Sequence, residues 1–181
     1  MGFNPRLATE RNDGAENRLE KIRGLIESSK YSIHDLSRCQ AKRKGEHFRL
    51  NMPFELGIDF GCRQYFGNGR EDKKFLILEE KKYRYQAALS DISGSDIAAY
   101  GDDKQLAPQN AVKHVRNWLV SEAGAVSIAV LKIWQSYAAG FQEWYYEKKI
   151  AEGASEQEIR EYPTNELLAA MREWIRIGQP V

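Results

Sequence analysis

The chain has 181 residues, 42% of them hydrophobic and 29% charged, which is typical of one globular domain or of one domain with a helical appendage. Lys and Arg total 27 against 26 Asp and Glu, so net charge gives no reason to expect a nucleic acid or an acidic membrane as partner. Two cysteines are too few for a disulfide framework or a cysteine-rich zinc site. No apolar run approaches the roughly 20 residues that span a bilayer, and the first residues lack a signal-peptide core, so we expect a cytoplasmic protein.

The first elements in chain order predict a parallel βαβ unit. Residues Arg6–Thr9 can form a strand of modest strength. Asp13 and Glu16 have the spacing of a capping box, and apolar residues at helical spacing predict a helix over residues 14–28. Tyr31–Ile33 then reads as a second strand. Strand, helix and strand in this order favour an α/β fold.

A polar stretch after that strand supplies the candidate site. Asp35 and Ser37 follow the strand directly, where open α/β sheets place their ligands. A basic loop covers residues 41–49, and Asn51 then opens a helix that carries Glu55 near its positive end. A carboxylate close to a polar strand end predicts a ligand site. His34 is predicted to be structural, because it has no His or Cys partner at ligand spacing, and no metal site is expected.

Further along the chain, Phe75–Leu78 is apolar throughout, as expected of an interior parallel strand, and it ends at the acidic pair Glu79-Glu80. Asp91 lies in a turn-rich segment and has the character of a turn former. Ile97–Tyr100 is a candidate edge strand, and residues 104–121 read as a helix.

Strand signals disappear from Gly124 onward. Aromatic residues separated alternately by four and three positions predict one long amphipathic helix over residues 125–150. Ser155 and Glu158 form a second capping-box pattern, and Thr164 begins the last predicted helix.

Three strings carry a resemblance to known proteins: Ile33-His34-Asp35-Leu36-Ser37-Arg38, Asn51-Met52-Pro53-Phe54-Glu55-Leu56-Gly57 and Ser90-Asp91-Ile92-Ser93-Gly94. The chain resembles a group of largely uncharacterised bacterial proteins that are themselves similar to Toll/interleukin-receptor (TIR) domains and nucleoside 2-deoxyribosyltransferases. This implies an α/β domain over residues 1–122, with a flavodoxin-like parallel sheet and helices on both faces, and a C-terminal helical extension over residues 123–181. A strand and helix normally precede the segment equivalent to residues 2–9, so the usual first strand is expected to be missing. Three alternatives follow: the start is misassigned, another chain fills the gap, or the sheet is rearranged.

In both enzyme families a glutamate of the corresponding helix is catalytic, which carries over to Glu55. Such enzymes cleave the bond between a ribose-type sugar and a base, and NAD is the usual substrate of the TIR enzymes. Cleavage builds positive charge on the sugar, which a nearby carboxylate can stabilise or trap. Asp35 is the second catalytic candidate, for binding sugar hydroxyls or orienting Glu55.

The resemblance also implies binding partners. The candidates for contacts to the sugar, base or phosphate are Ser37, Arg38, Asn51, Arg6, Arg18 and Asp91. We expect no cofactor, a nucleoside or nucleotide such as NAD as ligand, and a second copy or another chain as partner, with bacterial phage defence as a context. The alternative is a non-catalytic nucleotide-binding sensor or protein-interaction module. From the residues alone, Glu55 can equally be a carboxylate stabilised by the helix dipole, and Asp35 a capping or turn residue.

Overall fold

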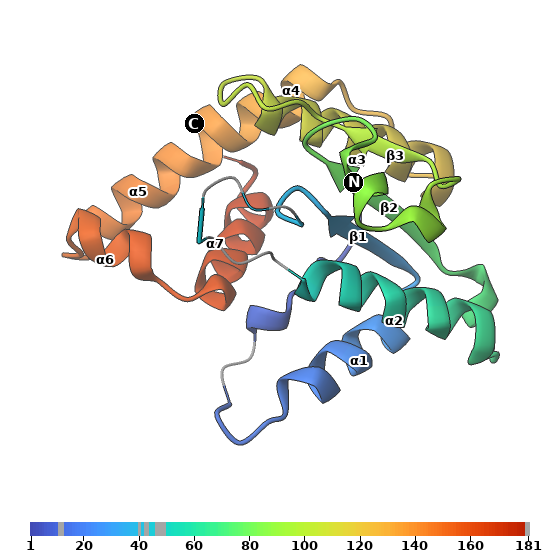
Figure 1. Ribbon diagram of the computed structural model, residues 1–181. Helices are drawn as coiled ribbons and strands as arrows, with labels where there is room; N and C mark the ends of the chain where they lie inside the picture. The colour runs from blue at the N-terminus through green and yellow to red at the C-terminus, as the bar shows by residue number, and fades with distance from the viewer. Residues whose placement is uncertain (11–12, 40, 42–43, 46–49, 180–181) are drawn as a thin grey trace. The chain divides into compact units, whose positions relative to one another are not determined.

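The sheet consists of three strands, β1 (Tyr31–Asp35), β2 (Lys74–Glu79) and β3 (Ile97–Ala99), which run parallel in the order β1-β2-β3 (Figure 1). They were identified in a computed structural model that describes residues 1–10, 13–39, 41, 44–45 and 50–179. These strands confirm the prediction of a parallel α/β sheet. The long connections between them contain helices, as parallel pairing requires.

The predicted strand at Arg6–Thr9 is wrong. Residues Ala8–Glu10 form a short 3-10 helix, η1. The Arg6 guanidinium donates to the Glu10 carboxylate at 2.8 Å through Nε, a contact between positions four apart that a turn permits and an extended strand does not.

Helices cover both faces of the sheet. On one face, α2 (Asn51–Tyr65) brings Asp59 to Ser32 and His34 of β1. On the other, α3 (Ala107–Ala123) places Trp118 edge-on to Tyr31, with the ring centroids 5.9 Å apart. Since neighbouring residues of a strand point to opposite faces, these contacts fix α2 and α3 on opposite sides.

The helix before β1 begins later than predicted. α1 spans Arg18–Ser28, and the Asn17 side chain caps it by accepting from the backbone amides of Leu19 and Glu20. The predicted capping box at Asp13 is therefore wrong. The Asp13 side chain instead accepts from the Ala15 amide at 2.9 Å, which closes a local turn before the helix starts.

The core of the sheet unit lies between β2 and α2. Leu36, Leu56 and Ile77 are buried there with Cys39 and Tyr85. Short 3-10 helices complete the unit: η2 (Arg70–Asp72), η3 (Arg84–Ala87) and η4 (Ser90–Ile92). Residues 17–126 make up this unit, whereas residues 1–16 group with residues 127–181 in a second one.

The second unit is helical, with α4 (Val130–Gln135), η5 (Ser136–Phe141), α5 (Gln142–Ala151), α6 (Glu156–Glu161) and α7 (Thr164–Arg176). The long helix predicted over 125–150 starts at Val130 and contains a π-helical segment, η5, which the heptad-like spacing did not reveal. Within η5, Gly140 packs so closely on the Trp174 ring that a Cβ atom there would lie 2.9 Å from it.

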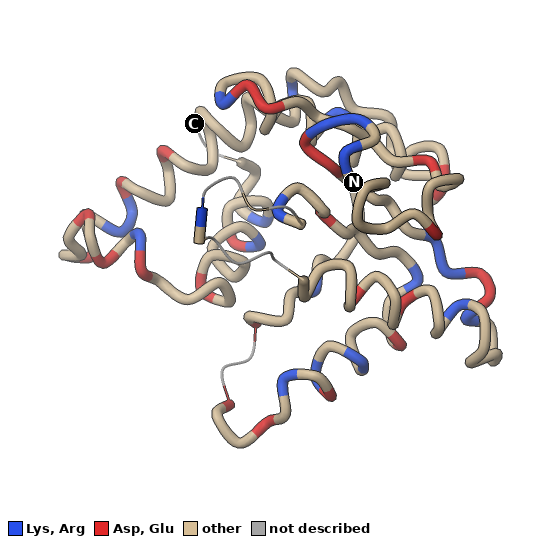
Figure 2. Tube along the Cα trace, viewed as in Figure 1, with Lys and Arg blue, Asp and Glu red and all other residues tan. Residues whose placement is uncertain are grey.

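Two further predictions for this unit are confirmed. Ser155 and Glu158 form a reciprocal capping box at the start of α6, and α7 begins at Thr164. Within the described residues, positively and negatively charged residues are interspersed along the trace (Figure 2). Among the residues that the structure describes, no helix combines the length and the apolar character needed to cross a membrane.

Candidate functional site at the carboxyl edge of the sheet

The carboxyl ends of the three strands bring Asp35, Glu79 and Tyr100 to one edge of the sheet. Asp35 ends β1, Glu79 ends β2 and Tyr100 directly follows β3. Tyr100 stays in line with the sheet because its amide donates to the Glu79 carbonyl at 3.0 Å. Ligands of open parallel sheets bind beyond this edge, so it is the place where the fold favours a functional site.

Asp35 is held by two neighbours in a defined orientation. Its carboxylate accepts from the Ser37 amide at 3.0 Å and from the Ser37 hydroxyl at 3.2 Å, which closes a turn at the end of β1. The Tyr100 hydroxyl approaches both carboxylate oxygens at 3.3 Å. Burial raises the pKa of Tyr100, and the Asp35 and Glu80 carboxylates raise it further against the opposing contact with Ser37. Tyr100 therefore stays protonated and acts as a donor at neutral pH.

Arg84 ties the strand ends to each other. It donates to Glu79 at 3.1 Å through Nε, to Glu80 at 2.7 Å through Nη1 and to the Ser37 carbonyl at 2.6 Å through Nη2. Glu79 is 1% exposed, so its charge needs this partner. The hydrogen bond to Glu79 is the main cause that raises the pKa of Arg84. Through these hydrogen bonds, Arg84 joins the turn after β1 to the end of β2.

Cys39 lies beneath this edge and is not poised as a nucleophile. Burial raises the pKa of its thiol to about 11, and the carboxylates of Glu79 and Asp35 add to the shift, against Arg84. At neutral pH the group is a thiol, whereas a reactive cysteine needs a lowered pKa.

Glu55 reaches the same edge from α2. Leu56 packs near Leu36 and Cys39 at the end of β1, whereas Phe60, one turn further on, stacks on Phe75 near the start of β2 with centroids 5.1 Å apart. The helix thus runs back from the carboxyl edge, and Glu55 sits at its edge-facing end, as Figure 1 also shows for the first turn of α2. The side chain of Glu55 is half-buried, and it forms no hydrogen bond or ion pair with any residue of the described part.

Asp59, one turn after Glu55, anchors α2 to the sheet. Its carboxylate is 0% exposed, lies 3.0 Å from His34 Nε2 and 3.1 Å from Lys73 Nζ, and accepts from the Ser32 hydroxyl. Burial on its own would raise the pKa of Asp59, but the hydrogen bonds from His34 and Ser32 and the charge of Lys73 outweigh it and lower the pKa. His34 therefore has the structural role that the sequence predicted.

The remaining candidates are exposed or lie elsewhere. Asn51 is the first residue of α2, Arg38 follows Ser37 in the loop after β1, Asp91 lies in η4 and Arg18 opens α1; all four are exposed, and no contact with Asp35 is present. Arg6 belongs to the other unit, where Glu10 binds it. Most of the predicted basic loop, residues 42–43 and 46–49, falls outside the described residues.

Sequence reasoning missed Tyr100 and Arg84 as members of this edge. The acidic end of β2, Glu79-Glu80, was visible in the sequence. Because a buried carboxylate needs a positively charged partner, the nearby Arg84 was the signal that could have indicated this ion pair. Within the part of the chain that the structure describes, no group of three His, Cys, Asp or Glu side chains is suited to hold a metal ion.

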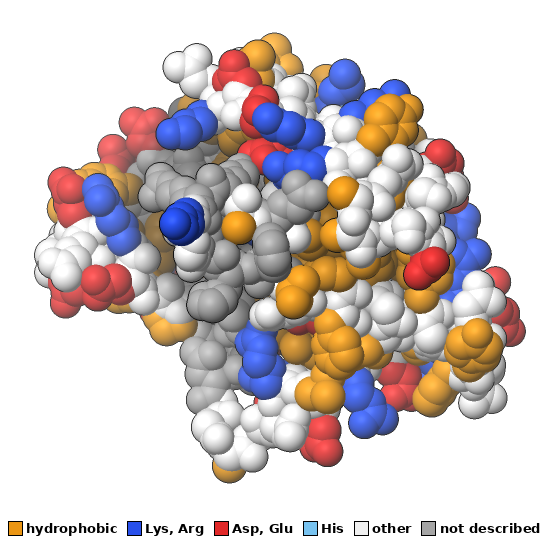
Figure 3. Space-filling model, viewed as in Figure 1, with side chains coloured by type: hydrophobic (Ala, Val, Ile, Leu, Met, Phe, Trp, Pro, Cys, Tyr) orange, Lys and Arg blue, Asp and Glu red, His pale blue; other side chains and the backbone are white. Residues whose placement is uncertain are grey.

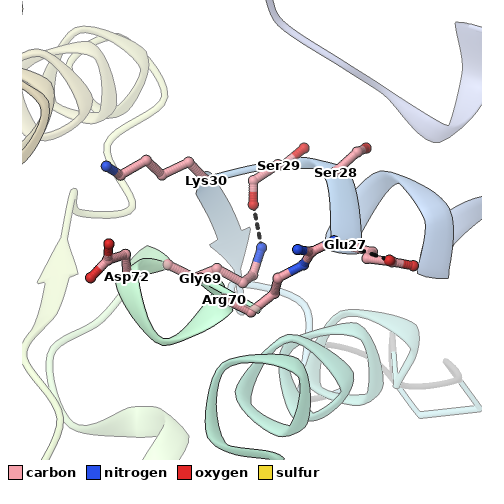
Figure 4. A pocket seen from close by; sticks show the side chains of 8 residues that line it. Glu27, Ser28, Ser29, Lys30, Gly69, Arg70 and Asp72 are labelled. Carbon is pink, nitrogen blue, oxygen red and sulfur yellow. Dashed lines mark hydrogen bonds and ion pairs between the residues drawn. The ribbon is translucent and has the colours of Figure 1, made fainter. Parts of the chain in front are cut away.

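A shallow pocket lies at the opposite, amino end of the strands (Figure 4). Two of its cations are engaged by the protein, since Arg70 pairs with Glu27 at 3.1 Å and Lys73 is buried against the end of α1. A third lining cation, Lys30, is exposed and lies 5.8 Å from the centroid of the Tyr31 ring. Lys30 can therefore meet an anionic ligand here, but the carboxyl edge, where side chains from three strand ends come together, remains the better candidate.

In comparisons with known proteins, no family model, no curated protein and no solved structure matches the chain.

Proposed function

We propose that the chain is an N-glycosidase or glycosyltransferase that acts on a nucleoside or nucleotide such as NAD, with Glu55 as its central carboxylate. The observation that supports this most is the placement of Glu55 and Asp35 at one edge of a parallel sheet, from different elements. Two carboxylates at one edge of a sheet are the smallest set of side chains that can stabilise positive charge on a sugar and hold its hydroxyls.

The two carboxylates have different surroundings and hence different roles. Asp35 is fixed by Ser37 and Tyr100 and keeps acceptor capacity for sugar hydroxyls, since an ionised carboxylate can accept several hydrogen bonds. The side chain of Glu55 forms no hydrogen bond in the described part of the chain, so its carboxylate is available to the substrate. As the bond between sugar and base breaks, the electron pair leaves with the base, and Glu55 stabilises or traps the positive sugar.

The test is release of free base from NAD and from a panel of nucleosides and nucleotides, followed by chromatography. Glu55→Gln is expected to lower the rate of base release by about 100-fold or more, while the affinity for the substrate is retained. Glu71→Gln is the matched control, because Glu71 is an exposed glutamate of η2 at the other end of the strands. If folded wild-type protein releases no base from any of these substrates, the proposed enzymatic activity is refuted.

A second candidate function is a non-catalytic nucleotide sensor or protein-interaction module that uses the same edge. One observation favours it: the side chain of Glu55 is not oriented by any hydrogen bond in the described residues, whereas catalytic carboxylates are usually held in place. A sensor would bind nucleotide equally well in wild type and Glu55→Gln and turn it over in neither, which calorimetry run beside the chromatography would show.

A further inference from the structure

The solvent-facing side of α2 carries no charged side chain. The three charged residues of this helix, Glu55, Asp59 and Arg63, are four positions apart and therefore form one row along it. That row faces the sheet, since Asp59 binds His34 of β1 and the Arg63 guanidinium lies 5.5 Å from the centroid of the Phe75 ring. Helices at a protein surface usually carry their charges on the opposite, outward side. In α2 the outward side is left uncharged.

Aromatic residues and glycines occupy this outward side instead. Phe54 is 58% exposed and Tyr65 is 90% exposed, and apolar side chains gather at the surface along the helix (Figure 3). Between them lie Gly57 and Gly61, where an added Cβ atom would have no atom of the chain within 4 Å. A glycine inside a helix costs about 0.5–1 kcal/mol relative to alanine. Packing within this chain does not require that cost at either glycine, whereas the close approach of a second helix would.

A shallow groove adjoins the same side of α2. It lies between α1 and α2, and its lining is mostly apolar, with Ile26 from α1 and Ile58, Gly61 and Cys62 from α2. Phe54 is seven positions before Gly61, two turns along one side of the helix. One surface therefore presents both a protruding apolar ring and an apolar groove, which is the arrangement of helices that pack ridge into groove.

We propose that α2 packs antiparallel on α2 of a second copy of this chain, around a two-fold axis midway between Gly57 and Gly61. Turning the helix around puts Gly57 opposite the partner's Gly61 and Phe54 beside the partner's Tyr65. Phe54 of each copy then enters the groove of the other, so that the same patch serves as ridge and as groove, as a two-fold interface requires.

The area of this patch is enough for a dimer, but not for a tight one. A large aromatic side chain buries roughly 150–250 Å² when it is fully covered, so the exposed parts of Phe54 and Tyr65 and the surface around the two glycines amount to on the order of 500 Å² per copy. Two copies together bury about 1,000 Å², the lower limit for a specific interface. The dimer is therefore expected to dissociate on dilution.

This pairing does not depend on the proposed glycosidase activity. Glu55 follows Phe54 by one position, which turns its side chain about 100° away around the helix. The carboxylate consequently stays outside the interface, at the edge of the sheet.

The experiment is the oligomeric state of the full chain, measured by sedimentation over a range of concentrations. Wild type is expected to show a monomer–dimer equilibrium. Gly61→Lys places a long charged side chain where the two helices come closest, and it should raise the dimer dissociation constant by at least about tenfold. The monomer should accept this change, because the position has open space and lysine favours a helix more than glycine does.

Gly24→Lys is the matched control. Gly24 is also a glycine inside a helix with open space around it, but it lies in α1. Its substitution should leave the dissociation constant unchanged. Wild type that is monomeric at every concentration, or a dimer that Gly61→Lys does not weaken, overturns the proposal, as does equal weakening by Gly24→Lys.

Hydrogen exchange of wild type decides the question if circular dichroism shows that Gly61→Lys is unfolded. Protection of peptides from α2 that rises with protein concentration supports the pairing. Protection of these peptides that is independent of concentration refutes it.

Discussion

The Tyr100 hydroxyl lies 3.3 Å from each carboxylate oxygen of Asp35, and so joins the ends of β1 and β3 across the intervening β2. This contact spans 65 positions of the sequence and orients the acid that we place in the site.

Removing that hydroxyl should loosen the edge. Tyr100→Phe is expected to lower the free energy of unfolding by about 1 kcal/mol, the usual worth of one hydrogen bond of this kind. If the site acts as proposed, the variant should also bind nucleotide more weakly. Urea unfolding and calorimetry are the measurements. Tyr65→Phe is the control: Tyr65 is 90% exposed, so its substitution should change neither the free energy of unfolding nor nucleotide binding. Equal effects of the two substitutions would contradict the role of Tyr100.

Asp59 should be the most sensitive single position of the sheet unit. Asp59→Asn leaves Lys73, which is 3% exposed, without its charged partner, and breaking a buried pair typically costs about 3–5 kcal/mol. Hydrogen exchange of peptides from residues 17–126, read by mass spectrometry, measures the loss. Asp72→Asn is the control, because Asp72 is exposed and should cost within about 0.5 kcal/mol. If Asp59→Asn lowers the free energy of unfolding no more than Asp72→Asn does, the ion pair between Asp59 and Lys73 contributes little to stability.

The same residue predicts a pH dependence. The pKa of Asp59 is lowered in the folded chain, so its contribution to stability is present above the pKa of an unfolded aspartate and is lost as the pH falls through the folded value. Unfolding of the sheet unit should therefore become easier below about pH 4. In Asp59→Asn the slope of stability against pH over that window should be smaller. Identical slopes in the two proteins would assign the acid sensitivity to other groups.

Gly140 should not tolerate a side chain. Gly140→Ala puts a methyl group 2.9 Å from the Trp174 ring, and overpacking of this kind costs about 1–3 kcal/mol. Trp134, Trp144 and Trp174 all lie in the second unit, so tryptophan fluorescence during urea unfolding reports mainly on it. Gly24→Ala is the control: Gly24 has open space around it in α1 of the sheet unit, so alanine there should leave the fluorescence transition of the second unit unchanged. Hydrogen exchange of peptides from residues 17–126 should show that it stabilises the sheet unit by about 0.5–1 kcal/mol. A neutral Gly140→Ala would show that Trp174 can move aside.

The strands could be predicted from the sequence because their information is local. Phe75–Leu78 is apolar at every position, and a run of this kind flanked by charges has few alternatives. The capping box at Ser155 was equally visible, since both of its partners lie within four residues of each other.

The site could be predicted only in part. Asp35 and Ser37 were accessible because they are close in sequence and follow a strand. Tyr100 was not, because its partner lies 65 positions away, and such a pair depends on strand order rather than on local pattern. Arg84 lies only five and four positions after Glu79 and Glu80, so this pairing was within reach of local pattern, whereas its contact with the Ser37 carbonyl, 47 positions away, was not. The π-helical segment was also missed. Its Gly140 lies against the Trp174 ring of a different helix, a contact that the local spacing of residues does not reveal.

The surface of the sheet unit also differs from what periodicity suggests. Leu50 and Phe54, at the start of α2, are 61% and 58% exposed, and apolar side chains are visible at the surface along this helix (Figure 3). An amphipathic pattern predicts which face of a helix can be buried, but the neighbouring elements decide how much of it is covered.

Lys73 has a consequence for how the chain folds as it is synthesised. Its ammonium group donates to the Ile26 carbonyl at 2.6 Å and to the Ser29 carbonyl, and thus closes the last turn of α1 from 47 and 44 positions downstream. On a ribosome, α1 emerges well before Lys73 does, and until then the Ser29 carbonyl can bond only to water and the Ile26 carbonyl has only the Ser29 amide, at 3.2 Å, as a protein partner. The end of α1 is therefore expected to fray in the nascent chain and to become ordered only when Lys73 arrives, so that the first helix of the sheet unit is completed after the second helix, α2, has emerged.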